Sequence, residues 1–186
     1  MYKNPQQKLL KNILCSKDIQ TNINNNLNDL LLIIPEIKNM IGFEHNHPHH
    51  HLDVWRHTIF ALSLSPNIFN VRLALLLHDI GKPHCFQIKG EFKHFKDHPK
   101  VSKDIAENIL NRLNYKKEYI NFICKIIENH DTPLNLEYIQ QNPKLCKILF
   151  KVQKCDALAH NPIYNAKRLE YIKNTKKLFK QINNKN

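Results

Sequence analysis

VRLALLLHDIGKP, residues 71–83, is the stretch that decides how the rest of the chain is arranged. Before its glycine, the only polar residues in it are Arg72, His78 and Asp79. A helix that is apolar on nearly all sides is normally buried at the centre of its domain. The stretch therefore predicts a central, buried helix around which the other elements pack.

The end of this helix carries the first candidate site. Gly81 suits the left-handed residue that often follows a helix, and Pro83 prevents the helix from continuing. His78 and Asp79 would then lie side by side in the last turn of a buried helix. Polar groups cost free energy there unless they are paired or bind a metal. The pair is therefore a candidate metal site.

Length and composition indicate one soluble globular domain. The chain has 186 residues, of which 24% are charged and 42% apolar. The start, MYKNPQQKLLKN, lacks the apolar core of a secretory signal, and the run Leu30 to Ile34 is too short to span a bilayer. The five cysteines form no CxxC pair and are odd in number. We expect reduced thiols in a cytoplasmic protein without a membrane partner.

The charge balance favours negatively charged partners. The chain has 28 basic and 16 acidic residues, a net charge of +12. Such an excess favours nucleotides, phosphates and RNA. A Lys- and Asn-rich composition can also reflect coding bias, and the lysines are scattered except for residues 173–185. We expect an anionic substrate, with RNA as an open alternative and the oligomeric state undetermined.

Periodic apolar residues predict an all-α domain. Pro35 ends the second helix, and Asn161-Pro162 resembles an N-cap followed by proline, opening the last one. Between residues 84 and 96, Lys89-Gly90 could turn a small hairpin. The predicted helices are residues 5–15, 19–34, 52–64, the central helix, 97–113, 116–130, 143–159 and 161–179.

Four of these helices place a histidine or aspartate in line with their core-facing residues, close to a helix end. Taken singly, each is more typical of a hydrogen-bonded core residue than of a ligand. Together with the pair on the central helix they predict a metal site. Imidazoles and carboxylates without thiolates suit Mn, Fe, Co, Ni or Mg better than a structural zinc of the cysteine type. The candidate ligands are His57, His78, Asp79, His98, His130 and Asp156.

Two further groups of residues could support this set. Asp53 lies four residues before His57, so it could accept the second ring N–H of that histidine, or simply be an acidic residue in a first helical turn. The histidines of the segment 45–51 resemble a metal-binding tract by composition. Because Pro48 places them in a loop, we expect them to contact solvent or phosphate rather than a structural metal.

The order His57, His78-Asp79, Asp156 resembles that of the HD superfamily of metal-dependent phosphohydrolases, and His98 and His130 resemble the additional histidines of its binuclear members. Five segments look like the HD module of bacterial tRNA nucleotidyltransferases, the CCA-adding enzymes and related poly(A) polymerases. They are PEI, HHHLDVWRHT, LALLLHDIGKP, HFKDHPKVS and CDALAHNP. The resemblance covers about residues 35–171, between N-terminal helices in 1–34 and a basic helix end and tail in 172–186.

The resemblance implies a phosphoester hydrolase with one or two divalent metals. Asp79 would bridge the two ions, and Lys82 would neutralise a phosphate oxygen or, equally well, offset a helix dipole. Metal-activated water would attack a phosphodiester or phosphomonoester of a nucleotide or an RNA end, as in a 2′,3′-cyclic phosphodiesterase. Arg56, His94 and His160 are weaker candidates for substrate contact.

One departure from the nucleotidyltransferases matters. Their palm carries a Gly-Ser turn and an Asp-x-Asp pair, whereas this sequence has no Asp-x-Asp and only three glycines. The resemblance therefore does not extend to nucleotide addition. Within the hydrolases, a nucleotidase or dinucleoside-polyphosphate hydrolase is the main alternative. A non-catalytic, metal-containing module that binds RNA or protein is the alternative of another class.

Overall fold

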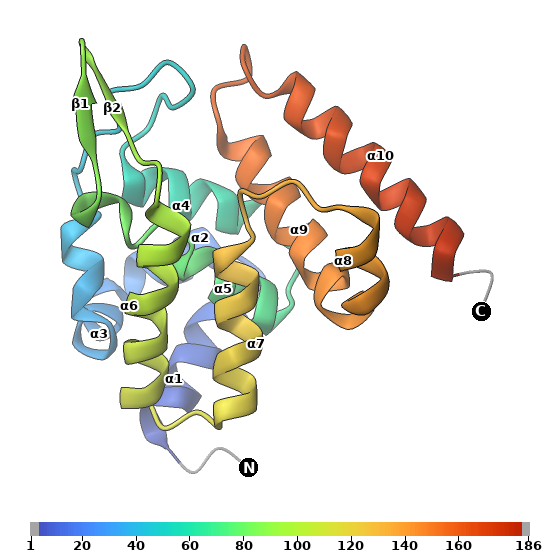
Figure 1. Cartoon of the computed structure of the whole chain (residues 1–186). Coiled ribbons are helices and arrows are strands. Elements are labelled where there is room, and N and C mark those ends of the chain that lie inside the picture. Colours follow the sequence, from blue (N-terminus) through green and yellow to red (C-terminus); the bar gives the residue numbers. More distant parts are fainter. Residues whose placement is uncertain (1–3, 184–186) are drawn as a thin grey trace.

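The computed structural model describes residues 4–183, and the regular secondary structure of this part is helical except for one small hairpin (Figure 1). The predicted all-α class is confirmed. No helix in this part of the chain is long and apolar enough to cross a membrane. The elements are α1 (Pro5–Leu14), α2 (Ile19–Asn25), α3 (Leu27–Ile33), the 3-10 helix η1 (Pro35–Asn39), α4 (Val54–Ser63), α5 (Phe69–Leu77), the 3-10 helix η2 (Lys82–His84), β1 (Gln87–Lys89), β2 (Phe92–His94), α6 (His98–Arg112), α7 (Lys117–Glu128), α8 (Leu136–Gln141), α9 (Pro143–Ala159) and α10 (Ala166–Asn183).

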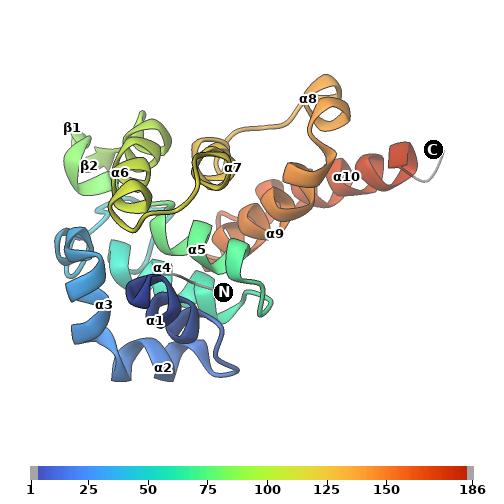
Figure 2. The same ribbon diagram turned by 90° about the horizontal axis from the view of Figure 1, so that it is seen from below.

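Helix α5 lies at the centre, as its sequence predicts. It contacts α1, α4, α6, α7 and α9, and every residue from Val71 to Leu77 is buried. The helices α1 to α3 cover one side of it, α6 and α7 the opposite side, and α10 lies along α9 (Figure 2). The buried Arg72 donates to the backbone oxygens of Leu14 and Ser16 at 2.6 and 2.7 Å, which satisfies its charge and ties α5 to the end of α1.

The end of α5 differs from the prediction in two respects. The helix ends at Leu77, so His78 and Asp79 lie in the turn that follows it rather than in its last turn. Gly81 has a φ of −82° and is not left-handed. Its lack of a side chain serves packing instead, because a Cβ there would lie 2.5 Å from the backbone nitrogen of Ser102 on α6. The glycine therefore lets the turn approach α6 closely.

Other helix boundaries also differ from the prediction. The stretch predicted as one helix over 19–34 is two, broken at Asn26, whose side chain bonds to the Asn22 carbonyl at 2.8 Å. Helix α8 was not predicted, and α10 begins at Ala166 rather than after Asn161. Residues 162–164 form a turn, in which Asn161 Oδ1 accepts from the Ile163 N–H, while the Asn161 amide groups donate to the loop 48–49.

The small hairpin between α5 and α6 is present. It pairs β1 with β2 in antiparallel register, with Gln87 opposite His94, and Gly90 in its turn has a φ of +62°. All five cysteines, which lie within the described residues, are unpaired. The proposed division at residues 34 and 171 stays a prediction, and the last part of the predicted tail, residues 184–186, lies outside the described residues.

Candidate metal centre

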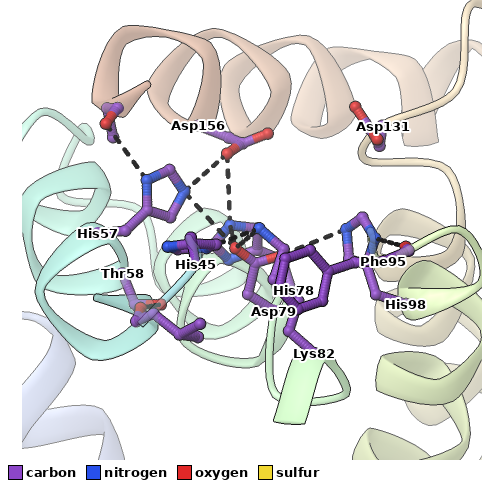
Figure 3. A network of polar contacts seen from close by, with 12 residues as sticks. His45, His57, Thr58, His78, Asp79, Lys82, Phe95, His98, Asp131 and Asp156 are labelled. Carbon is purple, nitrogen blue, oxygen red and sulfur yellow. Dashed lines mark hydrogen bonds and ion pairs between the residues drawn. The ribbon is translucent and has the colours of Figure 1, made fainter. Parts of the chain in front are cut away.

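The structure brings the six candidate ligands together at one buried point. Figure 3 labels five of them, all except His130. They come from five places in the chain: α4, the turn after α5, the first residue of α6, the residues after α7, and α9. All six side chains are buried. They are His57, His78, Asp79, His98, His130 and Asp156.

One half of the centre is built on two carboxylates. Asp156 Oδ1 lies 3.0 Å from His57 Nε2 and 3.5 Å from His78 Nε2. Asp79 Oδ2 lies 3.6 and 3.3 Å from the same two nitrogens. His57, His78 and Asp156 each offer one ligand atom, and these atoms all lie within 4.8 Å of one another. Two imidazoles and two carboxylates therefore face a common point.

The other half uses the second oxygen of Asp79. Asp79 Oδ1 lies 3.3 Å from His98 Nε2 and 3.8 Å from His130 Nε2. The two Nε2 atoms of His98 and His130 are 3.1 Å apart. Asp79 thus presents a different oxygen to each half, which is the arrangement of a carboxylate that can bridge two ions.

The four histidines are oriented by backbone carbonyls. In His78, His98 and His130, Nδ1 lies 2.6–2.7 Å from the carbonyl oxygen of the residue three positions earlier, and His57 Nδ1 lies 3.2 Å from the Ala159 carbonyl oxygen. A carbonyl only accepts, so each Nδ1 carries the proton and donates it. Metal-binding histidines commonly donate their second N–H in this way. A ring that carries no proton on Nε2 then presents the lone pair of that nitrogen to the centre.

This arrangement fits a bound cation. Acceptor lone pairs on Nε2 atoms and carboxylates face one another at 3.0–3.8 Å, which is repulsive unless a positive charge lies between them. Among the described residues, His78 Nε2 and both oxygens of Asp79 have no hydrogen-bond partner although they are buried. The donor set, imidazole and carboxylate, is one that divalent first-row metals and Mg²⁺ use. The centre can therefore hold one or two divalent metals.

The pKa shifts of the histidines differ in direction. Burial lowers the pKa of His57 to about 4 and the pKa of His130 well below its usual value, so both rings are neutral near pH 7. Burial also acts to lower the pKa of His78, but the neighbouring Asp79 and Asp156 outweigh it and raise that pKa to about 10. A metal would replace this proton, because only the neutral ring is a ligand.

Lys82 lies against the centre. Its Nζ is 2.8 Å from Asp79 Oδ2 and 3.1 Å from His45 Nε2, and the side chain is buried. His45 Nδ1 lies 2.7 Å from the Leu52 carbonyl oxygen, so its Nε2 is free to accept from the ammonium. We expected His45 to contact solvent or phosphate. The expectation is wrong for this residue, which is 1% exposed and holds a lysine.

The predictions for Asp53 and Arg56 also need correction. Asp53 caps α4 by accepting from the Arg56 backbone N–H at 2.8 Å, and the ring N–H of His57 goes to Ala159 instead. The contact predicted between Asp53 and His57 is therefore wrong. The side chain of Arg56 is 75% exposed, pairs with Asp53 and does not line the cavity at the centre.

A cavity of about 700 Å³ opens onto the centre. Its wall is rich in cationic and imidazole groups, and two predicted contact residues, His94 and His160, are part of it together with Lys82. The cationic side chains on its wall besides Lys82 are Lys89, Lys93, Lys96, Lys167 and Arg168. The site thus has room and charge for an anion larger than free phosphate.

Sequence reasoning missed Arg168. From α10, its Nη2 lies 2.8 Å from Asp156 Oδ2 and its Nη1 lies 2.7 Å from Asp131 Oδ1. It therefore holds the outer oxygen of Asp156 while the inner one faces the imidazoles. A basic residue in a Lys-rich last helix carries no sequence signal for such a role.

Comparison with known proteins agrees with this geometry. Residues 49–158, more than half of the chain, match the HD domain family. The CC-adding tRNA nucleotidyltransferase of Thermus thermophilus is 33% identical over 104 residues, 52% of this chain and 24% of the relative. The A-adding tRNA nucleotidyltransferase of Deinococcus radiodurans is 29% identical over 106 residues, 53% of this chain and 24% of that relative. These matches span about a quarter of each relative. The chain belongs to the HD domain family.

Proposed function

We propose that the protein is a divalent-metal-dependent phosphohydrolase that acts on a phosphodiester or phosphomonoester of a nucleotide or an RNA end. One observation carries the proposal. Four histidine rings donate a hydrogen bond from Nδ1 to a backbone carbonyl oxygen. Their Nε2 atoms face the buried carboxylates of Asp79 and Asp156. Membership of the HD domain family, a superfamily of metal-dependent phosphohydrolases, supports it.

The ligands divide naturally between two ions. His57, His78, Asp79 and Asp156 would hold the first, and His98 and His130 would hold the second with Asp79 shared between them. When bound, such ions activate water near neutral pH and polarise phosphoryl oxygens. The identity of the ion, among Mn, Ni, Co, Fe and Mg, is open.

The chain itself supplies positive charge and position. Lys82 is held by His45 and Asp79 on the cavity wall, where its ammonium can stabilise charge that develops on a phosphoryl oxygen. Arg168 fixes the orientation of Asp156 through its outer oxygen. His94 and His160, on the same wall, can contact the rest of the substrate.

The substrate class rests on charge and on the relatives. The cavity wall carries a set of lysines and an arginine, and the net charge of the chain is +12. Both relatives are named for action on tRNA, which favours a nucleotide or an RNA end over a small organic phosphate. A nucleotidase or a dinucleoside-polyphosphate hydrolase is the second candidate, because the cavity would also accommodate a free nucleotide.

The experiment is a hydrolysis screen of protein loaded with Mn²⁺, Ni²⁺ or Co²⁺. Bis(p-nitrophenyl) phosphate, 2′,3′-cyclic nucleotides, nucleoside monophosphates and dinucleoside polyphosphates are the substrates. We expect turnover of at least one class that chelator removes and that Asp79→Ala lacks. A fully loaded, folded protein that hydrolyses none of them would instead favour the non-catalytic module that binds RNA or protein.

A further inference from the structure

Three imidazoles gather beside the HD centre in a cluster that the HD motif does not use as a set. The rings of His50 and His160 have centroids 4.4 Å apart, and they lie 5.1 and 5.4 Å from the ring of His57. One ring nitrogen from each residue lies within 4.8 Å of the others. The three rings thus surround a common point on the cavity side of the HD centre.

The cluster is held in place by specific contacts between distant segments. Asn161, next to His160, donates from its backbone N–H to the His49 carbonyl at 2.8 Å and from its side chain to the Pro48 carbonyl at 3.0 Å. These bonds fasten the loop that carries His50 to the end of α9. The ring of His45 stacks on that of His50 at 3.8 Å with an interplanar angle of 6°. The position of His50 is therefore set from both sides.

His50 has a polar atom that nothing in the described chain satisfies. Its Nδ1 is buried and has no hydrogen-bond partner. A buried ring nitrogen without a partner is costly, and such atoms call for a ligand or an ion. Three imidazoles with an open fourth position are a common way of holding zinc in proteins.

We propose that His50, His57 and His160 form a third metal position, for an ion such as Zn²⁺ that imidazole ligands suit. Asp156 Oδ1 lies 3.0 Å from His57 Nε2 and 3.3 Å from His160 Nε2, so it is the one oxygen beside the three imidazoles. A set in which imidazoles predominate favours Zn²⁺ over Mg²⁺ and Mn²⁺, which prefer oxygen ligands. His57 belongs both to this set and to the HD centre. An ion at the third position therefore competes for His57 with an ion held by His78 and Asp156.

The test uses Co²⁺ as a spectroscopic substitute for Zn²⁺ in the full chain. Co²⁺ with three imidazoles and one water is four-coordinate and absorbs strongly in the visible range, whereas six-coordinate Co²⁺ at a carboxylate-containing centre absorbs weakly. We expect the wild type to develop the strong band on titration with Co²⁺, and stoichiometric Zn²⁺ to abolish it. His50→Gln and His160→Gln should each lose the band.

Two variants serve as controls. His49→Gln removes an exposed imidazole that lies against the Tyr164 ring and outside the cluster. It should keep the band, because the His49 backbone carbonyl that binds Asn161 remains. His98→Gln removes a ligand candidate of the HD centre that lies outside the cluster and should keep it as well. Circular dichroism verifies that each variant is folded.

The proposal is overturned if folded wild type shows no strong band, or if His50→Gln and His160→Gln show it at full strength. Loss of the band in His98→Gln but not in His50→Gln would assign it to the HD centre instead. Because the readout is metal binding, a failure of the proposed hydrolysis would leave this result unaffected.

Discussion

At the scale of single residues, Asp79 connects the two halves of the metal centre. Its Oδ2 faces His57 and His78, and its Oδ1 faces His98 and His130. Within residues 4–183 neither oxygen has a hydrogen-bond partner, and Lys82 Nζ forms an ion pair with Oδ2. Asp79 is therefore the residue whose carboxylate most requires a bound cation in both halves of the centre.

The first prediction concerns metal content. Protein purified without chelator should hold at least one first-row transition metal per chain, and Asp79→Ala should lose most of it because both halves lose an oxygen ligand. Elemental analysis of the two proteins measures this. A wild type that is free of metal and cannot be reloaded with Mn²⁺, Co²⁺ or Ni²⁺ would contradict the assignment.

The second prediction concerns Asp156→Asn. The amide keeps the shape of the side chain but removes the anionic oxygen that a divalent ion prefers, so hydrolysis should fall by several orders of magnitude. Folding should survive, because Arg168 keeps Asp131 as a partner. A purely structural ion pair would instead cost about 3–5 kcal/mol of stability on substitution.

The measurement pairs a thermal melt with a phosphodiesterase assay on the same sample. Asp131→Asn is the matched control, since Asp131 pairs with the same arginine but lies at the edge of the centre and is not one of the six candidate ligands. It should retain bound metal. A destabilised Asp156→Asn whose folded fraction keeps wild-type activity would exclude a catalytic role for the carboxylate.

At the scale of elements, the turn after α5 is placed by its contact with α6. Gly81 donates its backbone N–H to Ser102 Oγ at 2.9 Å, and no side chain fits between them. This contact sets His78 and Asp79 against His98 at the start of α6. The glycine is thus needed for close approach of two elements that both carry ligand candidates.

The third prediction follows from this contact. In Gly81→Ala, the new Cβ would meet the Ser102 backbone nitrogen at 2.5 Å, so the turn and α6 must move apart. Overpacking of this kind costs roughly 1–3 kcal/mol, measurable as a lower midpoint of denaturant unfolding. Ser102→Ala in the same background should not restore stability, because the clash is with backbone. An unchanged midpoint in Gly81→Ala would show that the close contact is absent in solution.

At the scale of the whole molecule, the chain contains the HD domain but no counterpart of an Asp-x-Asp pair, and it matches its relatives over about a quarter of their length. Polymerising enzymes hold catalytic Mg²⁺ through such carboxylates. The acidic residues that the structure gathers are instead those of the HD centre, among imidazoles.

The fourth prediction is that this chain adds no CMP or AMP to a tRNA that lacks its 3′ end. Purified protein, the truncated tRNA and labelled CTP or ATP with Mg²⁺ are the components, and a known CCA-adding enzyme is the positive control. Incorporation of label by this chain alone would show that it has a nucleotide-transfer site that does not use an Asp-x-Asp pair.

The central helix and the candidate ligands could be predicted from the sequence, because both depend on periodicity within single segments. The stretch 71–77, apolar except for Arg72, specified a buried central helix. Helical periodicity placed His57, His98, His130 and Asp156 on core-facing sides. His and Asp side chains that all point into one small core can lie at few positions without a shared ligand, so their convergence on one metal site was predictable.

Tertiary structure decided the features that depend on contacts between segments far apart in the chain. Helical periodicity does not encode which carbonyl accepts from His57, which carboxylate Arg168 reaches, or which of the loop histidines is buried against Lys82. The role of Gly81 likewise depends on α6, not on its own helix. A sequence pattern specifies the face that a residue presents, whereas its partner is set by how separate elements pack.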